Sequence, residues 1–450
     1  MNFKKIENWS LRYALLRIYV RFLHNTLFYK AVCVTGKENI PDKDPVFFAP
    51  NHQNALMDAL VILCNIKRQP VFIARADIFK NRIIAKILIF LKILPAYRIR
   101  DGKENLKKNE EIFNTSVRIL ENKQILTLFP ETTHTDLKRL QELKKGVQRI
   151  VFQAEEKNNF KLGVKIVPVG IYYSNYWNIQ SVIQLNFGKP IDITPFLDIY
   201  KENPQKAMLA LRDKITVELK PLMINIENKE YYEVFEFLRN FYTQKMLENL
   251  SLSNKQENRF RADQKTVELL EENYRQAPDR IKELSDKVLI YRNLLKKNNL
   301  KTWVIDRNAS LTILLIKSFI LVVLSPVFLY GYINNLIPYY IPKPITRKLR
   351  DRQFITSINY VSGMIFFPLF YIIQTSIIWI TCKEWWIMLA YLFSLPITGM
   401  MAFKIHRQFI KVKSQLKYYF LKNKEDGKQI TTLNREIYTS MNAFYANKKN

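Results

Sequence analysis

Short apolar runs alternate with longer amphipathic runs between residues 36 and 225. The short runs are rich in β-branched and aromatic residues, which is typical of strands, and the longer runs repeat apolar residues at helical spacing. We expect strands at residues 45–49, 70–74, 93–98, 124–129, 165–173 and 182–187. We expect helices at residues 54–65, 77–91, 104–121, 138–156 and 203–222. This alternation predicts an α/β domain at residues 36–225, in which helices flank a mixed sheet.

The segments on either side of this domain have a different pattern. Residues 1–35 combine many apolar side chains with Arg12, Arg17 and Arg21, which predicts an interfacial helix with basic anchors; a helix packed on the domain is the alternative. Residues 226–305 are rich in Glu, Lys, Leu and Tyr and predict a helical connector. Its expected helices are residues 229–248, 256–275 and 278–297.

Residues 306–410 contain apolar runs of membrane length. Residues 360–381 and 385–403 are each long enough to cross about 30 Å of hydrocarbon, so we expect two spans there. Residues 311–341 are too short for two crossings, and we expect a re-entrant segment that bends between Pro326 and Gly331; three plain spans are the alternative. The basic stretches beside these segments should stay on the cytoplasmic side, and a basic cytoplasmic tail should follow at residues 411–450.

The formal net charge is +30, from 70 Lys and Arg against 40 Asp and Glu. Such an excess requires an anionic partner, and nucleic acid and the membrane surface are the two candidates. The membrane surface is favoured because the apolar residues gather in membrane-length runs, which nucleic-acid binding does not require. The three cysteines and four histidines are scattered, so they predict neither a disulfide framework nor a metal site.

Polar side chains stand at the ends of four expected strands. His52 follows the first strand, and Asp58 comes six positions later. Histidine is suited to proton transfer near neutral pH, and a carboxylate can orient its ring. Six helical steps would leave these two side chains apart, so they meet only if His52 lies in the loop and Asp58 in the first turns of the next helix. The other strand ends carry Arg98 and Arg100, then Glu131, Thr132 and Thr133 with Lys144 after them, and finally Pro168.

This ordered set resembles the four sequence blocks of the glycerolipid acyltransferase family, whose members acylate glycerol 3-phosphate or lysophosphatidate. The first block of the family is usually Asn-His-x4-Asp, whereas this chain has five residues between His52 and Asp58. That spacing is similar to the one in fungal-type glycerol-3-phosphate and dihydroxyacetone-phosphate acyltransferases. The third block usually reads Phe-Pro-Glu-Gly, and Thr132 stands here in place of the glycine. The resemblance covers residues 36–225.

The resemblance implies acyl transfer from a thioester to a hydroxyl of a phosphorylated glycerol. His52 would be the general base, and Asp58 would orient it and stabilise its charged form. Arg98, Arg100 and Lys144 would bind the phosphate, because arginine grips phosphate through two donors and lysine acts as a point charge.

The remaining residues of the blocks have implied roles as well. Glu131 would position the glycerol hydroxyls or a neighbouring cation, and Thr132 and Thr133 would supply hydroxyls where the glycine is missing. Pro168 would shape the acyl pocket. No cofactor is implied beyond the donor substrate, acyl-coenzyme A or acyl-carrier protein. The catalytic domain would lie on the cytoplasmic side, where such donors are found.

The leading hypothesis is therefore a membrane-bound glycerol-3-phosphate acyltransferase of phospholipid biosynthesis. Lysophosphatidate as acceptor is the alternative within the same chemistry. A non-enzymatic basic membrane scaffold or lipid-binding protein is the alternative of another class; it explains the charge and the apolar runs but not four ordered blocks.

Overall fold

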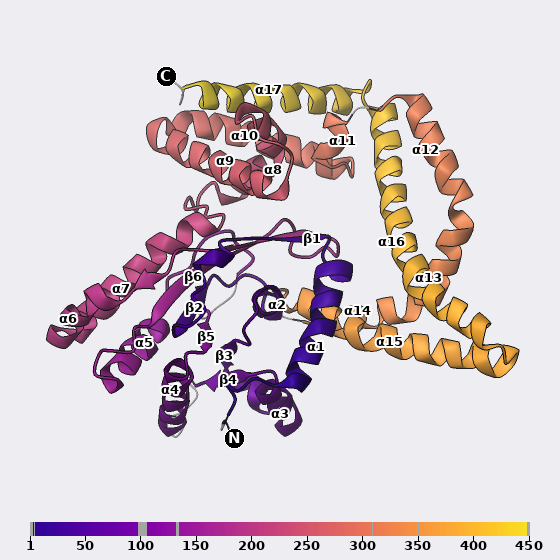
Figure 1. Cartoon of the computed structure of the whole chain (residues 1–450). Coiled ribbons are helices and arrows are strands. Elements are labelled where there is room, and N and C mark those ends of the chain that lie inside the picture. Colours follow the sequence, from indigo (N-terminus) through magenta and orange to yellow (C-terminus); the bar gives the residue numbers. More distant parts are fainter. Residues whose placement is uncertain are drawn as a thin grey trace. The chain divides into compact units, whose positions relative to one another are not determined.

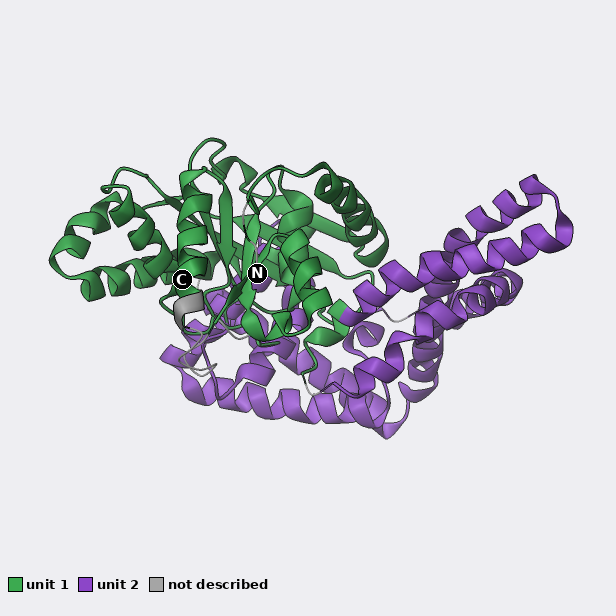
Figure 2. Cartoon of the chain, turned by 90° about the horizontal axis from the view of Figure 1, so that it is seen from below, with its two compact units in different colours: residues 1–225, 255–260, 351–357 green, residues 226–254, 261–350, 358–450 purple. Residues whose placement is uncertain are grey.

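The computed structural model describes residues 3, 5–97, 106–131, 135–307, 309–349 and 351–447, apart from the side chains of 106–108. The described chain forms two compact units, coloured separately in Figure 2. Unit 1 comprises Met1–Asn225, Lys255–Phe260 and Asp351–Ser357. Unit 2 comprises Ile226–Asn254, Arg261–Arg350 and Ile358–Asn450. Unit 1 therefore includes the beginnings of two helices, at residues 256–260 and 354–357, whose remainders belong to unit 2.

Unit 1 is built on an eight-stranded sheet (Figure 1). Its strands are β1 (Ala31–Thr35), β2 (Val46–Pro50), β3 (Val71–Arg75), β4 (Ile93–Ala96), β5 (Ile125–Leu128), β6 (Lys165–Tyr173), β7 (Val182–Phe187) and β8 (Ile191–Asp192). The strand order is β1-β7-β6-β2-β5-β3-β4, and β8 pairs with β6. The pattern of apolar runs had predicted six of these strands and missed β1 and β8.

The sheet is mixed, as expected. Strands β6, β2, β5, β3 and β4 run parallel to one another, whereas β7 and β8 are antiparallel to β6. Because the five strands are parallel, their carboxyl ends lie at one edge of the sheet, where the loops of α/β folds collect functional side chains. The edge strand β1 pairs in parallel with β7, so part of the expected interfacial segment belongs to the sheet instead.

The expected helices of unit 1 fall close to their expected positions with one exception, and the helix at residues 194–202 was not expected. The helices of unit 1 are α1 (Leu11–Phe22), α2 (Leu56–Asn65), α3 (Arg82–Phe90), α4 (Leu106–Glu121), α5 (Gly146–Lys157), α6 (Thr194–Glu202) and α7 (Pro204–Leu219), with π-helical or 3-10 turns at Leu23–Phe28, Lys37–Asn39, Ala76–Phe79 and Lys220–Leu222. The prediction of a helix from residue 138 was wrong, because α5 begins only at Gly146. The residues before it form a loop that is tied to the site described below.

One face of the sheet carries the main apolar core. Phe47 and Ala49 of β2 point to the same face, as alternate residues of a strand do, and pack in a fully buried cluster. The cluster joins β3, β5 and β6 to α4, α5 and α7, through side chains such as Leu120, Val151 and Leu211. This packing fixes the parallel strands and hence the positions of the loops at their carboxyl ends.

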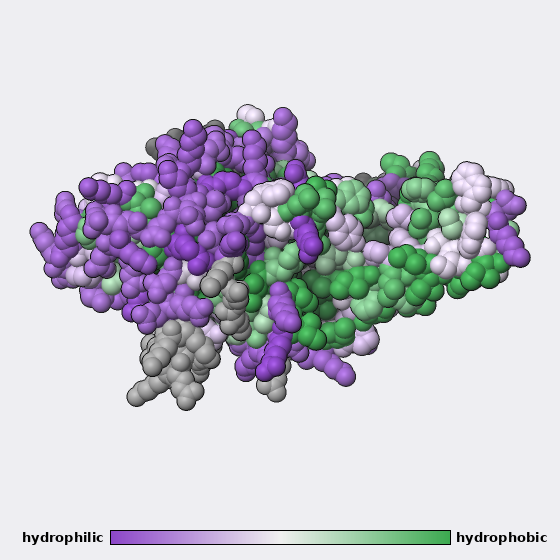
Figure 3. Space-filling view, turned by 60° about the horizontal axis from the view of Figure 1, so that its bottom comes forward, coloured by the Kyte–Doolittle hydropathy of each residue, from purple (hydrophilic) through white to green (hydrophobic). Residues whose placement is uncertain are grey.

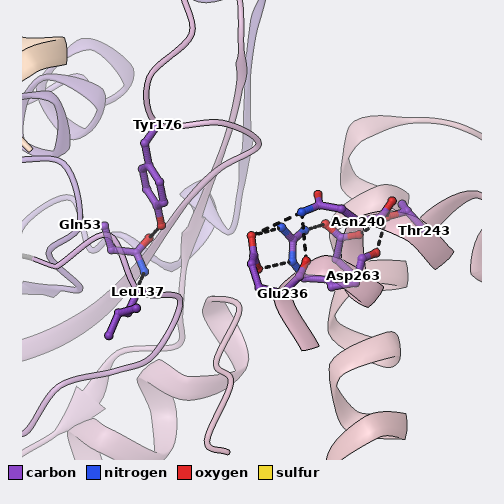
Figure 4. A network of polar contacts seen from close by, with 8 residues as sticks. Gln53, Leu137, Tyr176, Glu236, Asn240, Thr243 and Asp263 are labelled. Atoms are coloured by element: carbon purple, nitrogen blue, oxygen red, sulfur yellow. Dashed lines mark hydrogen bonds and ion pairs between the residues drawn. The ribbon is translucent and has the colours of Figure 1, made fainter. Parts of the chain in front are cut away.

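Unit 2 consists of helices. They are α8 (Tyr232–Asn249), most of α9 (Gln256–Gln276), α10 (Pro278–Lys297), α11 (Thr302–Asp306), α12 (Leu311–Val323), α13 (Ser325–Tyr340), α14 (Pro342–Arg347), most of α15 (Phe354–Cys382), α16 (Trp385–Leu421) and α17 (Glu425–Asn447). The segment expected as a basic tail is helical, and α17 packs on α8 and α10 through bonds such as that from the Tyr242 hydroxyl to Asn442. Within the connector, the fully buried Arg239 donates to Glu236 and Asp263 (Figure 4).

Two helices, α15 and α16, are long and apolar enough to cross a membrane. Hydrophobic residues gather on this part of the surface (Figure 3), where Ile372, Ile380 and Phe393 are exposed. The pair α12 and α13 is bent by 54° at the break between Val323 and Ser325, which fits a broken span or a re-entrant loop. The three apolar segments are joined by polar bonds, such as that from the Tyr371 hydroxyl to Asn335 at 2.6 Å.

Candidate active site

The carboxyl end of β2 is fixed to its neighbour β6 by the side chain of Asn51. This fully buried amide donates to the Ile171 carbonyl at 3.1 Å and accepts from the Ile171 N–H at 2.6 Å. The Asn51 backbone N–H donates to the Val169 carbonyl. Three bonds thus continue the ladder one residue beyond the strand, so the position of the next residue, His52, is well determined.

His52 and Asp58 are in contact, as the strand-loop-helix argument requires. The His52 Nδ1 lies 2.9 Å from Asp58 Oδ2, and the imidazole is 16% exposed whereas the carboxylate is fully buried. Because a carboxylate only accepts, Nδ1 carries a proton, and in the neutral form of the ring Nε2 then carries the lone pair. The ring stacks on Phe129 with centroids 4.3 Å apart. The imidazole is therefore oriented on two sides, in the tautomer that a general base needs.

The five-residue spacing between His52 and Asp58 is accommodated by an unusual backbone at Ala55. This residue has φ +44°, in the left-handed region that side chains with a Cβ rarely adopt. The turn allows α2 to begin at Leu56, which places Asp58 in its first helical turn. A carboxylate is stabilised there by the helix dipole. Asp58 Oδ2 also accepts the backbone N–H groups of Gln53 and Asn54, each at 2.7 Å, so the same oxygen shapes the loop.

Glu131 follows β5 and holds the His52 loop through the backbone. Its Oε1 accepts the His52 N–H at 2.6 Å, and its Oε2 accepts the Gln141 N–H at 2.9 Å. The side chain is 2% exposed. Burial raises the pKa of Glu131 to about 8, although the two N–H groups oppose this shift. Both carboxylate oxygens thus bind backbone, a role different from the expected contact with glycerol hydroxyls or a cation.

Two tyrosines that the sequence analysis did not single out complete the surroundings. Tyr173, at the end of β6, is fully buried and donates its hydroxyl to Asp58 Oδ1 at 2.8 Å. Burial, together with the Asp58 charge, raises the pKa of Tyr173 well above its ordinary value, so the phenol stays a donor. Tyr176 donates to Gln53 Oε1 at 2.8 Å (Figure 4). The sequence signal that could have identified Tyr173 is its place at the end of an apolar strand, because a buried phenol hydroxyl needs a hydrogen-bond partner.

The remaining predicted residues differ in their placement. Arg98, Arg100, Thr132 and Thr133 lie outside the described residues. Lys144 is an exposed residue whose ammonium lies 2.7 Å from Glu142, so its charge is already paired at the surface.

The sequence analysis placed Pro168 at the end of a strand, and this placement was wrong. Pro168 lies within β6 beside Ala49 of β2, and its carbonyl accepts the Gly188 N–H just after β7 ends. Proline has no N–H to donate. Because β7 ends beside Pro168, the ladder between β6 and β7 loses no regular hydrogen bond there. Pro168 is thus a buried sheet residue, three positions before Ile171, which holds Asn51.

The described groups fit proton transfer. Among the residues that the structure describes, no three His, Cys, Asp or Glu side chains are grouped as metal ligands. One nitrogen of His52 is held by a buried carboxylate that accepts four donors, so this carboxylate is fixed where it can stabilise an imidazolium. A base of this kind can deprotonate an alcohol as it attacks a carbonyl carbon.

Comparison with known proteins finds similarity to acyltransferases. Residues 31–172 match the protein-family model described as Acyltransferase. A 1-acyl-sn-glycerol-3-phosphate acyltransferase of Borreliella burgdorferi is 25% identical over 198 residues, which are 43% of this chain and 73% of that protein. Among solved structures, the 1-acyl-sn-glycerophosphate (LPA) acyltransferase PlsC from Thermotoga maritima matches with 20% identity and a TM-score of 0.34, over 47% of this chain and 78% of that chain.

Proposed function

We propose, from the premise that residues 31–172 form a domain of the acyltransferase family, that this chain is a membrane-bound glycerol-3-phosphate acyltransferase. The observation that carries the proposal is the oriented pair of His52 and Asp58 at the carboxyl edge of the sheet. The protein would transfer a fatty acyl group from a thioester, acyl-coenzyme A or acyl-carrier protein, to a hydroxyl of glycerol 3-phosphate.

In the proposed reaction, His52 Nε2 removes the proton of the acceptor hydroxyl while the oxygen attacks the thioester carbonyl. Asp58 stabilises the imidazolium that forms. The carbon–sulfur bond then breaks, the imidazolium returns its proton to the leaving thiolate, and the products are an ester and a free thiol. Because the base acts directly on the acceptor, no acyl-enzyme forms. General-base assistance of this kind contributes about 10²–10⁴ in rate.

The choice of acceptor depends on two different observations. The five-residue spacing between His52 and Asp58 favours glycerol 3-phosphate through the resemblance to fungal-type enzymes. The name of the similar protein from Borreliella burgdorferi favours lysophosphatidate, which is the second candidate. The acceptor phosphate of either would be bound by Arg98, Arg100 and Lys144. Glu131 would act by holding the backbone of His52 and not by touching the acceptor.

The membrane attachment would involve α15 and α16 as a two-span hairpin. Residues 351–357 lie in the same unit as His52, which supports a location of the catalytic unit on the cytoplasmic side with the basic residues that precede α15. The catalytic unit itself offers an apolar face. On one side of α1, Leu11, Leu15, Ile18 and Phe22 are exposed at helical spacing, which suits a helix lying at a bilayer surface.

The test is an acceptor assay with the full chain purified in detergent. Labelled acyl-coenzyme A is offered with glycerol 3-phosphate, dihydroxyacetone phosphate or lysophosphatidate in turn. We expect product with glycerol 3-phosphate and a loss of turnover in His52→Ala. His406→Ala, which alters a histidine of unit 2, should keep full activity. Product with lysophosphatidate alone selects the second candidate. If none of the three acceptors is acylated with acyl-coenzyme A or acyl-carrier protein, the enzymatic proposal fails.

A further inference from the structure

The first residues of the apolar helix α15 belong to the catalytic unit, although the helix continues as a possible membrane span. Asp351–Ser357 is part of unit 1, together with the sheet and His52. Thr356 is 3% exposed and donates its hydroxyl to the Tyr176 carbonyl at 2.8 Å, across 180 positions of sequence. Nearby, the Arg352 guanidinium lies 5.5 Å from the centre of the Trp177 ring. Tyr176 thus contacts the start of α15, and Trp177 contacts a residue just before this helix.

The bond made by Thr356 is unusual for a threonine in these helices. Thr375 in α15 and Thr398 in α16 donate to carbonyls four residues earlier in their own helix, Tyr371 and Ser394. That is the ordinary way for a hydroxyl in an apolar helix to be satisfied. Thr356 instead donates to a loop of the catalytic unit, so its bond fixes two segments that are distant in sequence.

The loop that Thr356 holds is bonded directly to the residue after His52. Tyr176 is 7% exposed and donates its hydroxyl to Gln53 Oε1 at 2.8 Å. The Gln53 amide in turn donates to the Leu137 carbonyl at 3.3 Å, and these three residues are drawn together in Figure 4. The Gln53 backbone N–H binds Asp58 Oδ2 at 2.7 Å. Gln53 therefore connects the Tyr176 loop to the carboxylate that orients the imidazole.

These contacts form one continuous chain: Thr356, Tyr176, Gln53, then Asp58 and His52. Because buried polar groups keep their partners, a shift at one end of such a chain is transmitted to the other end. Tyr176 and Thr356 both lie beyond residues 31–172, the segment that matches the family model. The chain of contacts is thus added to the family domain by other parts of this protein.

We propose that Thr356 and Tyr176 are positioning residues for the acyl-transfer reaction, so that the start of α15 completes the active site as well as leading into the membrane segment. The inference rests on the proposed function. Neither residue needs to touch substrate, because both act on the His52 loop through Gln53. A misplacement of catalytic groups by about 1 Å can cost up to about 10²-fold in rate, so even a small relaxation of this loop should be measurable.

The test compares Thr356→Val, which removes the hydroxyl with little change of shape, with Thr356→Ser, which restores it. Thr375→Val is the matched control, because it removes a hydroxyl that serves only its own helix. We expect Thr356→Val to lower kcat about 3–30-fold with little change in the acceptor KM, Thr356→Ser to recover most of the rate, and Thr375→Val to have no effect. Tyr176→Phe should lower kcat to a similar extent, and the double variant with Thr356→Val should be no worse than the poorer single variant.

A second measurement separates this proposal from the proposed function. Hydrogen–deuterium exchange of the full chain in detergent follows the peptide around residues 51–58 without needing turnover. Thr356→Val should speed exchange in that peptide, whereas Thr375→Val should not. If exchange changes as expected but no acceptor is acylated, the structural link stands and the proposed function fails. If Thr356→Val leaves both exchange and kcat unchanged, or if Thr375→Val causes the same losses, the positioning role is refuted.

Discussion

Replacing Asp58 by Asn tests whether the buried carboxylate contributes charge or only shape. The side chain accepts four donors: Oδ2 binds His52 Nδ1, Gln53 N–H and Asn54 N–H, and Oδ1 binds the Tyr173 hydroxyl. An asparagine can keep its amide oxygen in the place of Oδ2, and its NH2 group then faces Tyr173. The Tyr173 hydroxyl can rotate and accept a hydrogen bond from this NH2 group. The loop should therefore keep most of its bonds, while the negative charge beside His52 is lost.

The expected magnitude follows from the geometry. The imidazolium that forms during the reaction faces Asp58 across an N–O distance of 2.9 Å. At charge separations of about 4 Å and the effective dielectric of protein sites, such a pair interacts by about 4 kcal/mol. Since each 1.36 kcal/mol is a factor of ten in rate, Asp58→Asn should lower kcat by about 10³-fold. The KM for the acceptor should change little, because the charge acts in the transition state.

The assay measures steady-state acyl transfer by the purified full chain, with circular dichroism and thermal unfolding as checks on folding. Asp198→Asn is the matched control, because Asp198 forms an exposed ion pair with Lys201 and should leave kcat unchanged. A kcat for Asp58→Asn within tenfold of wild type, or a loss confined to KM, would refute the charge argument and leave Asp58 as a residue that only shapes the loop.

Three further predictions concern the neighbours of this pair. Tyr173→Phe removes one hydrogen bond to a charged group, worth about 1.5–3 kcal/mol, and should lower kcat about 10–150-fold with an unchanged KM. A wild-type kcat would contradict the role of the phenol. Glu131 has a pKa raised to about 8 in the folded chain, whereas the unfolded chain loses this proton near the ordinary value of 4.5. Between these two pH values the folded state holds a proton that the unfolded state has lost. The free energy of unfolding therefore falls as the pH rises, by on the order of a few kcal/mol. Thermal unfolding of Glu131→Gln, measured over the same pH range, should lack this part of the pH dependence. If the Lys144 ammonium leaves Glu142 to bind the acceptor phosphate, Lys144→Ala should raise the acceptor KM about tenfold. Lys145→Ala, which loses a bond to Gln205, is the control. Equal KM values in the two variants would exclude phosphate binding by Lys144.

Much of the fold could be predicted because the relevant signals are local. Apolar runs of five to nine residues predicted β2 to β7, and the membrane-length runs predicted α15 and α16. The short β1 and β8 were missed because brief edge strands carry little periodic signal. The start of α5 was misplaced because residues 138–145 are held as a loop by tertiary bonds such as that from Gln141 to Glu131.

The sequence by itself placed His52 after a strand and gave the condition for contact, that Asp58 lies in the first turns of the next helix. Spacing along the chain is enough for this, since both residues belong to one strand-loop-helix segment. Only the tertiary structure decided what surrounds them. Tyr173 and Tyr176 lie 115 and 123 positions from their partners Asp58 and Gln53, and Thr356 lies 180 from Tyr176. Such contacts depend on strand order and helix packing, which local periodicity does not encode.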